Sequence, residues 1–251
     1  MTRSSSRAGG TMLAALMAPV ALMMLMILVA LMPAPAWSHD AISSESRKAY
    51  VAKLDELQRG AASGSVSARA VALIETGKLL DEIRSLLNED IISHGKIQGL
   101  ETTMLVSQLN ATPYKLQQSP QTRLILADLR PWREALALEP KGAHAALARY
   151  RVLKNHFYVS FVDNPLKPVQ QSKETLLEMI GLGEGLLSTK HAEIDSEEVH
   201  FVLAIHYLQA AESGVVPKAK CQQRVQELMR KFRSSWPNSL KLATLDALAN
   251  P

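Results

Sequence analysis

Apolar residues recur every three or four positions along most of the chain after residue 43, the spacing of one face of an α-helix. Polar residues fill the positions between them, and capping or helix-breaking residues bound several of these segments. The pattern predicts about nine helices. In chain order they cover roughly 44–59, 67–93, 100–109, 119–131, 143–161, 169–187, 196–208, 218–234 and 239–249.

The fourth of these segments depends on two prolines. Ser119 followed by Pro120 predicts a capping serine with proline at the first helical position. The leucines at 124, 126 and 129 would continue this helix, and Pro131 would kink or break it.

No segment alternates apolar and polar residues convincingly enough to predict a strand. Short connections between amphipathic helices favour antiparallel helix pairs. The sequence therefore predicts an all-α fold, in which helix pairs stack either as a short repeat-like superhelix or as an irregular helical bundle.

A junction near the C-terminus shows how tightly consecutive helices follow one another. Trp236 and Pro237 are expected to end one helix, because proline disfavours helical geometry in the residue before it. Asn238 or Ser239 then caps the next helix, which restarts at once. Such a tight restart predicts an antiparallel or steeply crossed pair.

Three segments of the chain carry the spacing of small, aromatic and proline residues found in one repeat family. The matching positions are Trp132, Ala135 and Pro140, then Leu203, Ala204 and Tyr207, and finally the stretch FRSSWPNS at 232–239. These segments resemble tetratricopeptide repeats, which are stacked helix pairs. The resemblance implies partner binding on the first helix of each repeat, and the helix after Pro140 would occupy such a place.

The first 38 residues have the pattern of an export signal. Arg3 and Arg7 precede an apolar, charge-free run over 12–32, and small residues follow it. Cleavage before Trp37 or before His39 would release the protein. The alternative is that residues 12–32 remain as a membrane anchor, since they are long enough to span a bilayer. Either reading predicts a periplasmic or secreted location, with membrane contact only through an uncleaved N-terminal segment.

Charge and cysteine content exclude several classes of function. The 251 residues carry 28 basic and 24 acidic side chains, and two of the basic ones lie in the leader. This balance predicts no nucleic-acid partner, because phosphate binding requires a concentrated basic surface. Cys221 is the only cysteine, so neither an internal disulfide nor a cysteine-based zinc site is expected.

The sequence holds no phosphate loop, no Gly-x-Ser-x-Gly and no His-Glu-x-x-His motif. His200 and His206 are six residues apart, which places them on different faces of a helix rather than at chelating spacing. We therefore expect no catalytic residues, no metal site and no cofactor.

Polar residues recur along one side of the helix predicted over 143–161. The apolar side of this helix is expected to face the core. The residues at helical intervals on the other side are His144, Arg151, Asn155 and Tyr158. Arg and Tyr are enriched among residues that carry binding energy, so this stripe is the predicted partner-binding site. The alternative is an ordinary solvated helix face.

Together these features predict a leader over 1–38 and a single all-helical domain over 39–251. The expected function is that of an exported helical scaffold that binds a protein or peptide partner in the cell envelope, without catalysis. The alternative is an enzyme or small-ligand carrier with its site inside a helical bundle.

Overall fold

The computed structural model describes residues 42–163 and 171–249, which contain nine helices and no β-strand. This confirms the predicted all-α fold. The predicted export signal and the possible start sites at Trp37 and His39 lie outside the described residues. The helices are α2 (Ser44–Ala62), α3 (Val66–His94), α4 (Leu100–Asn110), α5 (Arg130–Leu138), α6 (Ala145–Asp163), α7 (Lys173–Leu186), α8 (Ser196–Glu212), α9 (Lys218–Ser235) and α10 (Leu240–Ala249).

The helices belong to two compact units, each described by itself. The first, which we call the N-terminal unit, contains residues 42–163 and 181–199. The second, the C-terminal unit, contains residues 171–180 and 200–249. The division into a leader over 1–38 and one domain over 39–251 stays a prediction.

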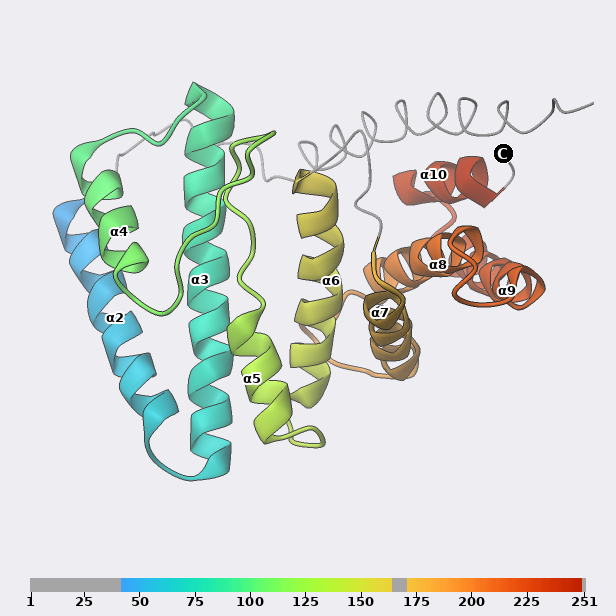
Figure 1. Ribbon diagram of the computed structural model, residues 1–251, viewed down its shortest axis with the longest axis horizontal. Coiled ribbons are helices and arrows are strands. Elements are labelled where there is room, and N and C mark those ends of the chain that lie inside the picture. The colour runs from blue at the N-terminus through green and yellow to red at the C-terminus, as the bar shows by residue number, and fades with distance from the viewer. Residues whose placement is uncertain (1–41, 164–170, 250–251) are drawn as a thin grey trace, which may run out of the picture. The chain divides into compact units, whose positions relative to one another are not determined.

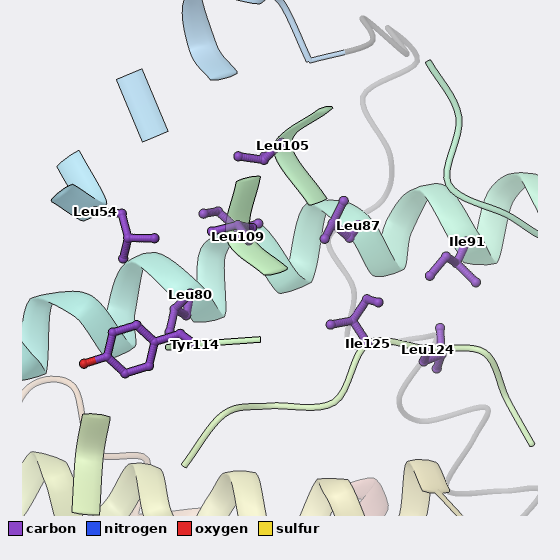
Figure 2. Packing of buried hydrophobic residues seen from close by; sticks show 10 residues of the cluster. Leu54, Leu80, Leu87, Ile91, Leu105, Leu109, Tyr114, Leu124 and Ile125 are labelled. Atoms are coloured by element: carbon purple, nitrogen blue, oxygen red, sulfur yellow. The ribbon is translucent and has the colours of Figure 1, made fainter. Parts of the chain in front are cut away.

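In the N-terminal unit the long helix α3 lies between α2 and α5, and α4 packs on α2 (Figure 1). The apolar core forms where these helices meet the loop after α4, and Figure 2 shows its members converging on α3. The core residues are Leu54, Leu80, Ile83, Leu87, Ile91, Leu105, Leu109, Tyr114, Leu124 and Ile125. Their burial removes a large apolar area from water and stabilises the unit.

Short capping signals fix the ends of α2 and α3. The hydroxyls of Ser43 and Ser65 accept hydrogen bonds from the backbone N–H groups of Ser46 and Ala68, at 3.0 and 3.2 Å. Gly95 ends α3 with a φ of 73°, and its N–H donates to the carbonyl of Ile91. Glycine adopts this left-handed conformation without steric cost, so the residue stops the helix where the sequence predicts.

A close approach between α3 and α5 depends on Gly77. The indole of Trp132, 0% exposed, lies directly against this glycine. A Cβ atom built on Gly77 would come within 2.7 Å of Cζ2 and 2.8 Å of Nε1 of the indole. The missing side chain is therefore what allows the largest buried residue of the unit to fit between the two helices.

The prediction of a helix beginning at Ser119 is wrong. The segment 111–129 is irregular, with one antiparallel bridge between Gln118 and Ile125. The side chain of Asn88, buried in α3, forms with this segment the hydrogen bonds that a neighbouring strand would otherwise form. Its Oδ1 accepts from the Ile125 N–H at 2.6 Å, and its Nδ2 donates to the Ile125 carbonyl at 3.0 Å. A helix would have used those backbone groups in its own hydrogen bonds.

Pro131 also has the opposite role to the one predicted. It lies in the first turn of α5, where the missing N–H of proline costs no hydrogen bond. The proline therefore begins α5 rather than breaking a helix that started twelve residues earlier.

In the C-terminal unit α9 ends and α10 begins where the sequence predicts. Helix α9 ends at Ser235, and the Ser239 hydroxyl accepts from the Lys241 N–H at 3.1 Å at the start of α10. Trp236 is half-buried, with its ring 5.2 Å from those of Phe232 and His200. An ion pair between Arg233 and Asp246 links the two helices on the outside.

Replacing Gly77 by alanine tests the close approach of α3 and α5. Alanine favours a helix over glycine by about 1 kcal/mol, but the added methyl collides with an indole that has no room to move. We expect a net loss of about 2 kcal/mol in the free energy of unfolding, measured by chemical denaturation. The matched control is Gly181→Ala in α7, where no atom lies within 4 Å of the new methyl, and there we expect a gain. Equal gains at both positions would contradict this account.

Two aromatic deletions test the α9–α10 junction. Phe232 is fully buried, so Phe232→Ala should cost about 3–5 kcal/mol. Trp236 keeps part of its ring in water, and we expect Trp236→Ala to cost about half as much. Urea unfolding of both variants gives the comparison. A cost below about 0.5 kcal/mol for Trp236→Ala would show that the corner is only a surface turn.

Candidate functional site

The predicted binding stripe lies on and just before α6, and the structure places its members differently from one another. His144 lies in the turn before the helix and is half-buried. Arg151 and Tyr158 are half-buried within the helix, while Asn155 is only 2% exposed. Partner binding by these residues stays a prediction, and three of them, Arg151, Asn155 and Tyr158, already contact other side chains of the unit, as follows.

Arg151 and Asn155 meet at a carboxylate of α3. The Asn155 Nδ2 lies 3.3 Å from both carboxylate oxygens of Asp81, and the Arg151 Nη1 lies 3.8 Å from one of them. The guanidinium of Arg151 also lies over the Trp132 ring, 5.7 Å from its centroid. These contacts tie α6 to α3 and α5.

Tyr158 belongs to a second polar group, centred on the buried Glu198 of α8, which is 3% exposed. The Tyr158 hydroxyl donates to one carboxylate oxygen at 2.5 Å, and the Tyr150 hydroxyl donates to the other at 2.9 Å. The Lys154 ammonium lies 2.8 Å from the same carboxylate. A buried charge with this many partners is compensated, so the group links α6 to the start of α8 within the N-terminal unit.

Burial and the neighbouring charge of Glu198 raise the pKa of both Tyr150 and Tyr158. The two phenols therefore remain protonated and keep donating at all ordinary pH values. Glu198 itself is positioned by the capping residue before it, since Asp195 Oδ1 accepts from the Glu197 and Glu198 N–H groups. Asp195 therefore caps the start of α8.

A pocket of about 480 Å³ opens elsewhere in the N-terminal unit, where the end of α2, the start of α3, the loop after α4 and α5 come together. Its walls are mostly apolar, with four polar side chains among them. The lining residues are Gln58, Ala61, Ala62, Arg69, Leu73, Pro113, Tyr114, Glu134, Ala137 and Leu138. The volume falls within the range of small-ligand sites, about 300–1,000 Å³.

Local backbone geometry explains why the pocket forms at the ends of helices. Gly64, with a φ of 101°, permits the sharp turn between α2 and α3. Arg69 then folds back across the turn, and its Nε donates to the Ala61 carbonyl at 3.0 Å. On the far side, Trp132 holds α5 against α3, and α5 thereby supplies the remaining wall.

The polar groups of the pocket are incompletely paired. Within the part of the chain that the structure describes, the Ala61 carbonyl is the one polar partner of Arg69, and no carboxylate pairs with its guanidinium. The Gln58 Nε2 is buried without a hydrogen-bond partner. Tyr114 packs its ring in the core with its hydroxyl directed away from the other labelled residues (Figure 2). Burial, followed by the charges of Glu134 and Asp128, raises the pKa of Tyr114 and keeps it protonated.

The lone thiol of the chain belongs to the C-terminal unit and is not among the residues that line this pocket. Cys221 is buried at the start of α9, its Sγ lies 3.8 Å from the Val216 carbonyl, and burial raises the pKa of the thiol. Across residues 42–163 and 171–249, no three His, Cys, Asp or Glu side chains are placed to hold a metal ion.

Comparison of the chain with protein-family models, with curated proteins and with solved structures gives no match. The resemblance to tetratricopeptide repeats stays a prediction. A search of the described helices finds none with the length and apolar character needed to cross a membrane.

Sequence reasoning missed the pocket because its polar residues come from four separate segments. Gln58 and Arg69 lie near helix ends and Glu134 lies in the middle of α5, and the three share no spacing in the chain. The sequence feature that could have indicated the pocket is the pair of alanines at the end of α2, followed by a Gly-Ser turn and an arginine. Small side chains beside a turn leave room for a cavity.

Removing the buried carboxylate tests the polar link between α6 and α8. Glu198→Ala leaves one ammonium and two phenols without their acceptor, and we expect it to cost about 3 kcal/mol of unfolding free energy. The matched control is Glu193→Ala, which removes an exposed pair with Lys78 at 3.3 Å and should cost less than about 1 kcal/mol. Thermal or urea unfolding measures both. Equal small costs would mean that Glu198 is dispensable for the unit.

Proposed function

We propose that this chain is an exported, non-catalytic helical scaffold whose N-terminal unit binds a protein or peptide partner at the pocket between α2, α3 and α5. One observation carries the proposal. The pocket combines apolar walls with hydrogen-bonding groups that the described part of the chain leaves incompletely paired, Arg69 and Gln58. Such groups gain more from a ligand than groups already paired.

The residue types in the pocket support binding rather than a reaction. Its lining offers donors from Gln58, Arg69 and Tyr114 and a single carboxylate, from Glu134. Nucleophilic catalysis requires a nucleophile beside a base, and the lining contains neither Ser, Cys nor His.

The predicted stripe on α6 supports the proposal less directly. The contacts of Arg151, Asn155 and Tyr158 within the unit make α6 a rigid support behind α5. In the proposed arrangement α6 positions the pocket wall, and the partner contacts α5 rather than the stripe.

Export is proposed from the sequence alone. The basic start, the apolar run over 12–32 and the small residues after it have the order of a signal peptide. The partner would then be a component of the cell envelope or of the exterior.

Site-directed photo-crosslinking in cells tests the binding role. We expect a photoreactive amino acid at Ala137, an exposed lining residue, to form a discrete adduct with one partner. The same amino acid at Glu89, exposed on α3 away from the lining residues, should form none. Arg69→Gln should diminish the Ala137 adduct, because the unpaired guanidinium would no longer hold the partner. Equal adducts at both positions, or an adduct insensitive to Arg69→Gln, would contradict the proposed site.

A further inference from the structure

The pocket between α2, α3 and α5 also indicates the chemistry of what enters it, on the condition that the proposed function is right and the pocket binds. We propose that it binds a single carboxylate carried on a short apolar group. The carboxylate would be held by Arg69 and Gln58, with the apolar group against Leu73, Ala137 and Leu138.

The charge argument begins with Arg69. Several arginine side chains in this unit pair with carboxylates: Arg47 lies 2.6 Å from Glu101, and Arg130 lies 2.5 Å from Asp128. Arg69 is half-buried and holds only the Ala61 carbonyl, through Nε. Its terminal N–H groups form a planar fork that fits a carboxylate with two parallel hydrogen bonds.

Gln58 provides the second donor. Its Nε2 is buried and has no hydrogen-bond partner, although Gln58 lines the same pocket as Arg69. A buried amide without a partner is destabilising, and an acceptor on a ligand recovers that cost. Because both residues line one pocket, a ligand acceptor with two oxygens can meet both donors, which a single hydroxyl cannot do as well.

Glu134 limits the charge of the ligand. Its carboxylate lines the pocket but is exposed, so water and salt screen its repulsion of one anionic group. A ligand with a second negative charge near the rim would meet that repulsion at closer range. The apolar walls and the volume of about 480 Å³ then favour a short apolar group rather than further polar ones.

Titration of the isotope-labelled chain, isolated as the cell processes it, tests this chemistry by NMR. The probes are hexanoate, N-acetyl-leucine and hexanamide, the uncharged counterpart of hexanoate. We expect both acids to shift the backbone signals of Leu73 and Ala137. Hexanamide should bind at least about tenfold more weakly than hexanoate. Tighter binding of hexanoate would identify a free short-chain acid as the source of the carboxylate. Tighter binding of N-acetyl-leucine would identify a peptide terminus or an acylated amino acid, and either result supports the carboxylate.

Three variants with a matched control assign the effect to residues. Arg69→Gln should weaken binding of the acids about tenfold. Arg59→Gln, which removes a similar Nε contact to the Asp55 carbonyl outside the pocket, should change nothing. Glu134→Gln should strengthen binding by removing repulsion. Gln58→Met should weaken binding while leaving the unfolding free energy unchanged or higher, because it removes an unpaired buried amide.

Equal affinity for hexanoate and hexanamide would overturn the carboxylate assignment. So would a failure of both acids to bind, or an equal loss of affinity for the acids in Arg69→Gln and Arg59→Gln. The crosslink at Ala137 does not depend on these results, because its formation requires no carboxylate on the partner. If the crosslink forms but neither acid binds, the pocket binds a ligand of another chemical class. If the crosslink also fails to form, the proposed function is wrong.

Discussion

The N-terminal unit depends on a steric constraint, the insertion of Trp132 against Gly77. A tryptophan offers a large apolar area to a small core, but it can pack between two helices only where one of them lacks a side chain. This contact holds α5 on one side of α3 while α2 occupies the other (Figure 1). It also offers the ring face on which Arg151 of α6 rests. Three helices are therefore positioned by one glycine.

Polar side chains then fix the register that apolar packing leaves free. Apolar contacts are non-directional, and helices can slide or rotate at small cost when only leucines meet. Asn88, Asp81 and Glu198 each form directed hydrogen bonds with a segment distant in the sequence. Each of these groups would be costly to bury alone, so arrangements that separate the partners are disfavoured. The polar groups thus select one arrangement among several of similar apolar burial.

The sequence predicted those parts of the fold that local signals determine. Helical periodicity and the glycine after α3 located most helix ends to within a few residues. The helix expected from Ser119 fails for a reason that no local rule contains. Asn88, 37 residues before Ile125, offers this segment the hydrogen bonds of a strand partner, and two adjacent apolar residues, Leu124 and Ile125, are buried there. Proline also carried an ambiguous signal, because Pro131 can end one helix or begin another.

The candidate site could not be predicted for a related reason. A helical wheel assigns each residue to a face of its helix. It does not say how many of those faces are packed against other helices. On α6 the stripe of Arg151, Asn155 and Tyr158 has the polarity of a solvated surface, yet these side chains contact carboxylates of α3 and α8. A helix covered on two sides must pair its polar residues internally, which leaves fewer of them for a partner. Donors without a partner can also remain where helices end and their faces diverge. The pocket at the end of α2 and the start of α3 is such a place, and there the arginine and the glutamine keep donors that the described fold does not use.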